Sequence, residues 1–186
     1  MSRDHKLIQS VAVLALITGF ILMIPFIAMQ FTGEIVWTLS DFIVAGILLF
    51  GTGLTYILAN QKSGNTAYRV AVGLALGTGL FLIWANLAVG LIGSEDNPAN
   101  LMYFGVIAVG IIGTLASHLR PRGMEYTLLA TAFAQGLIVV ITIIIGMQQD
   151  PVIPVFQILY ENGFFIALWI GSALLFRRAY KQLPSS

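Results

Sequence analysis

Residues 154–176 read PVFQILYENGFFIALWIGSALLF, and this stretch decides the fold. It is long and apolar enough to cross the hydrocarbon core of a bilayer, which takes about 20 residues of helix. Glu161 lies inside it and is the one acid well inside any apolar run of the chain. A charge at the centre of a membrane helix costs about 2.5–3.5 kcal/mol on insertion scales. Glu161 is therefore the first candidate functional residue.

The composition of the whole chain agrees with this reading. Of 186 residues, 58% are hydrophobic and 9% are charged, against roughly 25% charged in an average soluble domain. We therefore expect an all-α polytopic membrane protein. The absence of cysteine excludes disulfides, thiolate metal sites and cysteine nucleophiles. The two histidines, His5 and His118, argue against a zinc site made by this chain alone.

Six apolar runs are near or above the length of a transmembrane helix. Short connections make consecutive helices antiparallel, so we expect one transmembrane domain over residues 1–186. The first run is longer than the roughly 7–15 residues of a signal-peptide core, so it reads as a retained span. The start of the sixth helix stays open between Asp150-Pro151 and Pro154. The predicted spans are residues 7–30, 37–59, 68–93, 98–119, 124–147 and 154–176.

Three local signals mark helix ends. Thr38 and Asp41 have the spacing of a capping box. Asn97-Pro98 has the pattern of an N-cap followed by proline at the first helical position. Residues 120–123, Arg-Pro-Arg-Gly, indicate a turn before the fifth helix.

The charges orient the predicted bundle. All nine basic residues fall at the N-terminus, in the 2–3 and 4–5 connections or at the C-terminus, whereas the other three connections contain Glu34, Glu95, Asp96 and Asp150. By the positive-inside rule both termini are cytoplasmic. The basic residues are Arg3, Lys6, Lys62, Arg69, Arg120, Arg122, Arg177, Arg178 and Lys181.

A weak internal repeat accompanies this topology. ALITG at residues 15–19 recurs as ALGTG at 75–79 and, more faintly, as AFAQG at 132–136. Three tandem helical hairpins would produce such a pattern. Chance matching among apolar residues would produce it too.

Several segments resemble a family of small multipass bacterial inner-membrane proteins whose function is uncharacterised. They are WANLAVGLIGSEDNPAN at residues 84–100, DFIVAGILLFGTG at 41–53, RPRGM at 120–124 and NGFF at 162–165. The resemblance implies a bacterial inner membrane. It supplies no activity, cofactor or functional residue.

Intramembrane polar residues form a possible cluster. At 1.5 Å per helical residue, Glu161 and Asn86 lie about 10 Å inside the outer boundary and Asp41 about 5 Å inside it, while Gln135 lies near the middle of its helix. Trp84, Tyr103 and Tyr160 lie at neighbouring depths. We expect the four polar residues to be the transport or solute-binding candidates.

Helical spacing supports an inward orientation of these side chains. Two stripes of small and polar residues are predicted to face other helices. Each candidate also has a structural interpretation. Asp41 would be a helix cap, and Asn86 and Gln135 would be interhelical hydrogen-bonding residues. For Glu161 a functional and a structural role are equally favoured. The stripes are Gly79, Asn86, Gly90 and Gly93, and Thr127, Thr131, Gln135 and Thr142.

Two functions follow from these features. The first is a small transporter or channel for a proton, a cation or a small polar solute, with Glu161 as the binding group. The second is a non-catalytic subunit or scaffold that binds a partner membrane protein, or forms a homo-oligomer, through its small-residue faces. The sequence shows no hydrolase, metalloprotease or P-loop motif, so we expect no enzyme, no cofactor and no nucleic-acid partner.

Overall fold

A computed structural model describes residues 3–33, 36–94, 96–146 and 154–182. Within these ranges the chain forms six α-helices and one short 3-10 helix, with no strand, so the all-α prediction is confirmed. All six helical spans are long and apolar enough to cross a membrane. The chain is therefore an integral membrane protein of six spans, as expected.

The chain divides into two compact units, Met1–Lys62 and Ser63–Ser186. Each unit is described by itself. The single transmembrane domain expected over residues 1–186 stays a prediction.

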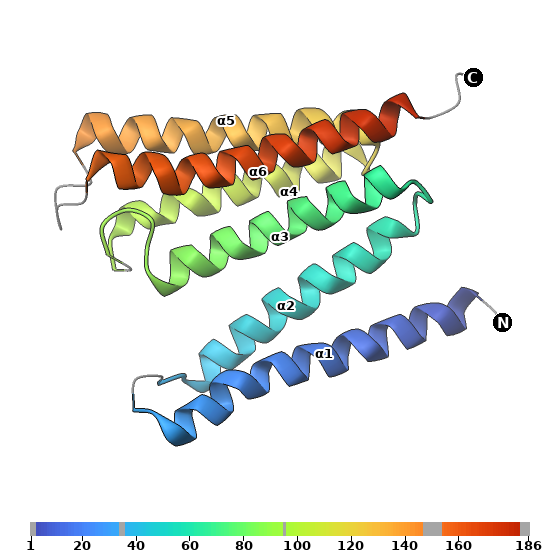
Figure 1. Ribbon diagram of the computed structural model, residues 1–186, viewed down its shortest axis with the longest axis horizontal. Coiled ribbons are helices and arrows are strands. Elements are labelled where there is room, and N and C mark those ends of the chain that lie inside the picture. The colour runs from blue at the N-terminus through green and yellow to red at the C-terminus, as the bar shows by residue number, and fades with distance from the viewer. Residues whose placement is uncertain (1–2, 34–35, 95, 147–153, 183–186) are drawn as a thin grey trace. The chain divides into compact units, whose positions relative to one another are not determined.

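Unit 1 is an antiparallel hairpin of α1 (Arg3–Phe31) and α2 (Leu39–Asn60) (Figure 1). Glycines allow the two helices to approach closely, because a Cβ at Gly53 would overlap the side chain of Leu14. The N-terminus of α2 has the predicted capping box. The Thr38 amide donates to Asp41 Oδ2 at 2.7 Å, and the Asp41 amide donates to Thr38 Oγ1 at 3.4 Å.

Unit 2 is a bundle of four helices, α3 (Thr66–Ala88), α4 (Met102–Ser117), α5 (Pro121–Ile145) and α6 (Val155–Lys181). The 3-10 helix η1 (Pro98–Leu101) leads into α4. Figure 1 shows α5 beside α6, and α6 packs against α3 while α5 packs against α4. Helix α3 contacts α6 more extensively than it contacts its sequence neighbour α4. The repeat of three hairpins stays a prediction.

One predicted span end was wrong at the connection between α3 and α4. The third helix ends at Ala88 and not at Gly93, because Gly90 and Gly93 have left-handed φ values of 71° and 72°. The predicted cap at Asn97 is confirmed, with its side-chain oxygen accepting from the Ala99 amide at 2.9 Å. The first turn after it is 3-10 rather than α-helical.

The predicted turn at residues 120–123 was also wrong. Helix α5 already begins at Pro121, which suits the first helical position because proline has no amide to satisfy there. The chain reverses at His118 and Leu119, with φ values of 52° and 61°.

Pro154 is the N-cap of α6, and α1 and α6 extend beyond the predicted 7–30 and 154–176. Glu34, Glu95, Met147 and Asp150-Pro151 lie outside the described residues.

Candidate functional site

Polar side chains from three helices meet in the interior of unit 2. Asn162 Oδ1 on α6 accepts hydrogen bonds from the Tyr103 hydroxyl of α4 at 2.9 Å and from Gln135 Nε2 of α5 at 3.3 Å. Gln135 Oε1 in turn accepts from the indole N–H of Trp169 on α6 at 2.9 Å. All four side chains are buried. We call these four residues, Tyr103, Gln135, Asn162 and Trp169, the amide cluster.

Hydrogen bonds within the protein occupy the amide cluster. Asn162 Nδ2 donates to the carbonyl oxygen of Ile158 at 3.0 Å, so both ends of this amide are engaged. In an apolar surrounding an unpaired polar group is costly, and pairing across helices removes that cost. The arrangement therefore ties α4, α5 and α6 together, which is the structural reading given to Gln135 from the sequence.

The polar stripe on α5 faces the interior as predicted. Thr127, Thr131, Gln135 and Thr142 are all buried. Thr127 and Thr131 donate to carbonyl oxygens one turn earlier in α5, at 3.0 Å and 2.9 Å. A Cβ at Gly113 of α4 would lie 2.5 Å from Thr127 Cγ2, so this stripe meets α4 at glycine.

Asn86 belongs to a second set of contacts. It lies two residues before the end of α3, and not seven residues inside the span as expected, because the helix stops at Ala88. Its Nδ2 donates to the main-chain oxygen of Asn100 at 3.1 Å. Its Oδ1 is buried and has no hydrogen-bond partner among the described residues.

Asn100 fixes the connection that follows α3. Its side-chain oxygen accepts from the amides of Leu91 and Ile92 at 3.0 Å and 2.9 Å, and its Nδ2 donates to the Ser94 oxygen at 2.7 Å. Leu91 and Ile92 are buried. We call residues 89–94 with Asn100 the asparagine-capped loop. Its Leu91 and Ile92 side chains pack inward at the end of α3.

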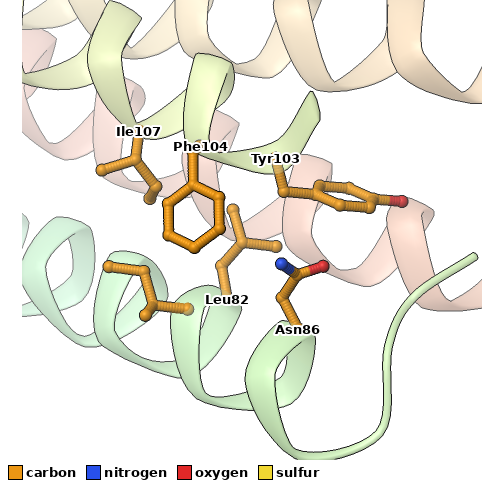
Figure 2. A pocket seen from close by; sticks show the side chains of 6 residues that line it. Leu82, Asn86, Tyr103, Phe104 and Ile107 are labelled. Atoms are coloured by element: carbon orange, nitrogen blue, oxygen red, sulfur yellow. The ribbon is translucent and has the colours of Figure 1, made fainter. Parts of the chain in front are cut away.

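A small hollow lies between α3 and α4. In Figure 2, Leu82 and Asn86 of α3 face Tyr103, Phe104 and Ile107 of α4. The hollow is too narrow for a water molecule. Asn86 and Tyr103 are the polar residues on its wall, so it adjoins the amide cluster at Tyr103.

The four candidates are divided between the two units. Asp41 belongs to unit 1, where it caps α2. Its contacts therefore match the structural interpretation of Asp41 as a helix cap. Glu161 is partly exposed on α6 and accepts a hydrogen bond from Gln157 Nε2 of the same helix at 2.9 Å. Within unit 2, Asn86 and Gln135 are hydrogen-bonded to residues other than Glu161.

Sequence reasoning missed Asn162, Asn100 and Trp169. A signal for two of them exists, since Asn162 and Trp169 are seven residues apart and so lie on one face of a helix. Asn100 could have been found from the glycines before it, because Gly90 and Gly93 predict an irregular backbone that needs a polar side chain. In the described parts of the chain, no group of three or more His, Cys, Asp or Glu side chains could hold a metal ion.

Comparison with protein-family models, with curated proteins and with solved structures finds no match for this chain.

Proposed function

We propose that this integral membrane protein is a non-catalytic subunit or scaffold that binds a partner membrane protein through α6. The observation that carries the proposal is the environment of Glu161. The carboxylate lies within an apolar span, is partly exposed, and is hydrogen-bonded to Gln157 on its own helix. A partner chain that donates to Glu161 would remove the cost of a polar group against lipid.

The surface around Glu161 has the form of a helix-binding face. Gln157, Tyr160, Glu161 and Phe164 have the i, i+3, i+4, i+7 spacing that places residues on one side of a helix. Tyr160 is 69% exposed and Phe164 46% exposed. We call these four residues, Gln157, Tyr160, Glu161 and Phe164, the α6 face. A polar pair surrounded by aromatic rings offers both hydrogen bonding and packing to another helix.

The charge distribution selects a different chain rather than a second copy. Contacts between the start of α5 and the end of α6 bring the basic residues of these helices to the opposite end of α6 from Glu161. Arg69 lies at the same end of unit 2 as these basic residues. Four residues before it, Asn65 Nδ2 donates to Oε1 of Gln182, the residue that follows α6, at 2.9 Å. A second copy inserted in the same direction therefore brings no cation to Glu161. The expected partner has a Lys or Arg side chain in the outer half of a span.

Photo-crosslinking tests the proposal directly. A photoreactive residue at Tyr160 should give an adduct with one distinct membrane protein, and Glu161→Leu should abolish it. Phe133→Ala is the matched control, since Phe133 is an exposed aromatic residue of α5 and not one of the four residues of the α6 face. Replacing the partner's donor residue should abolish the adduct as well. An adduct only with a second copy, or a partner retained by Glu161→Leu, would contradict the proposal.

We also infer that the protein resides in a bacterial inner membrane with both termini in the cytoplasm. The segregation of the nine basic residues supports the orientation, and the family resemblance supports the membrane. Because the chain has no cysteine, single substitutions can be labelled selectively. Lys181→Cys should react with an impermeant maleimide only after the cells are lysed. Asp96→Cys should react with the same reagent from the periplasm, before lysis. The reverse pattern would overturn the orientation.

A transporter or channel for a proton, cation or small polar solute is the second candidate. The buried and unpartnered Oδ1 of Asn86, on the wall of the hollow between α3 and α4, favours it. Widening of that hollow would expose Asn86 and Tyr103 to a solute. Proteoliposome flux should then fall in Asn86→Leu and Gln135→Leu while Asp41→Asn leaves it unchanged. Equal flux in all variants and in empty liposomes would exclude transport.

A further inference from the structure

We propose that the start of α5 and the end of α6 form a binding site for the headgroup of an anionic phospholipid. The site is distinct from the α6 face, which lies at the other end of the same helix. These two helix ends carry five cations, and we call them the basic rim: Arg120, Arg122, Arg177, Arg178 and Lys181.

A cation–π contact fixes the centre of the basic rim. The guanidinium carbon of Arg122 lies 5.6 Å from the centroid of the Tyr180 ring, which joins the first turn of α5 to the last turn of α6. Arg122 and Tyr180 are both exposed. This contact restricts the guanidinium, whose planar fork carries five N–H donors. Such a group is suited to a phosphate, which it can contact through two parallel hydrogen bonds.

The local charge is strongly positive. In the described turns of α5 and α6 around the site, Glu125 is the one acid, and it pairs with Arg177 at 3.8 Å. Glu125 is the more buried partner, with side-chain exposures of 16% and 55% for Glu125 and Arg177. One carboxylate cannot neutralise the basic rim. The excess positive charge attracts an anion at the membrane surface.

The surroundings select a lipid rather than a soluble phosphate. Tyr126 on α5 is 60% exposed, and Tyr180 on α6 is 41% exposed, as is typical of side chains at the headgroup level. Further into the span, Leu129 and Leu174 are exposed apolar residues on the same two helices. A phosphate held by Arg122 would therefore have its acyl chains along an apolar wall. A soluble anion would leave that wall unused.

Native mass spectrometry of the full chain, purified in a neutral detergent with equal amounts of phosphatidylglycerol and phosphatidylcholine, tests this site. Wild type should retain phosphatidylglycerol preferentially, and Arg122→Gln should reduce the preference about fivefold, as expected for one basic residue near the surface. Tyr180→Phe keeps the ring and should keep the preference. Tyr180→Leu should lower it.

Arg69→Gln is the matched control, because Arg69 lies on α3 and donates to the Ser63 carbonyl instead. An equal loss in Arg69→Gln and Arg122→Gln would show diffuse charge and overturn the site. Equal retention of the two lipids by wild type would overturn it as well. Displacement of phosphatidylglycerol by millimolar inorganic phosphate would identify a soluble anion as the ligand. Thermal unfolding in neutral detergent, measured for every variant, separates loss of binding from loss of fold.

Discussion

The hydroxyl of Tyr103 donates a hydrogen bond to Asn162 Oδ1 at 2.9 Å, joining α4 to α6 across the interior of unit 2. The same oxygen accepts from Gln135 of α5. One amide thus serves three helices. The stability of the bundle should depend on it more than on the neighbouring Glu161.

We expect Asn162→Leu to destabilise unit 2 by about 1–3 kcal/mol, because it leaves the Tyr103 hydroxyl and the Gln135 amide buried without their acceptor. Tyr103→Phe should cost less, about 0.6 kcal/mol, as is average for a hydrogen bond between membrane helices. Unfolding in detergent measures both. Glu161→Gln is the control and should leave stability unchanged. A similar loss in the control would mean that the cluster is not the stabilising element.

Close packing of α4 on α5 should be sensitive to one methyl group. Gly113→Ala forces a Cβ against Thr127 and should cost about 1–3 kcal/mol, as overpacking does. Gly105→Ala on the same helix meets open space and should be neutral or stabilising by up to about 1 kcal/mol. Adding Thr127→Ala should restore most of the stability lost in Gly113→Ala. Equal effects of the two glycine variants would argue against a close approach at Gly113.

The asparagine-capped loop should not tolerate a side chain at Gly90. Gly90 has a φ of 71°, and a Cβ there would overlap the Ser94 oxygen and Asn100 Nδ2. The left-handed conformation alone costs an alanine about 1–2 kcal/mol. Hydrogen exchange at Leu91 and Ile92 should therefore accelerate in Gly90→Ala. It should not accelerate in Gly77→Ala, a helical control with open space around it.

Tryptophan fluorescence should separate the interior from the lipid-exposed surface. Trp169 is 4% exposed and Trp84 43% exposed. Brominated lipids should quench a variant that retains Trp84 alone, and should quench one that retains Trp169 alone much less. Equal quenching would place the Trp169 indole at the surface and contradict its bond to Gln135.

The six spans could be predicted from the sequence because apolar length is a direct consequence of bilayer thickness. The end of α3 could not. Leu91 and Ile92 continue the apolar run of the helix, yet they belong to a loop whose polar backbone Asn100 satisfies. An apolar segment packed inside protein looks the same in sequence as one inside lipid. The error placed Asn86 well inside a span, whereas it lies two residues before the end of α3.

Among the candidate residues, Gln135 has the interior position expected from its stripe. Attention to charge favoured Glu161 over Asn162. Consecutive residues of an α-helix point about 100° apart, so the two side chains cannot share a direction. Because α6 carries apolar residues on all of its faces, its hydrophobic pattern did not show whether Glu161 or Asn162 faces inward.

The division of the chain between Lys62 and Ser63 has a practical consequence for protein engineering. Helix α2 ends at Asn60 and α3 begins at Thr66, so a fluorescent reporter or an epitope tag spliced between Lys62 and Ser63 interrupts neither. Exposed connections that join separately packed segments tolerate such insertions best. The same junction is the natural cut for producing the chain as two co-expressed polypeptides.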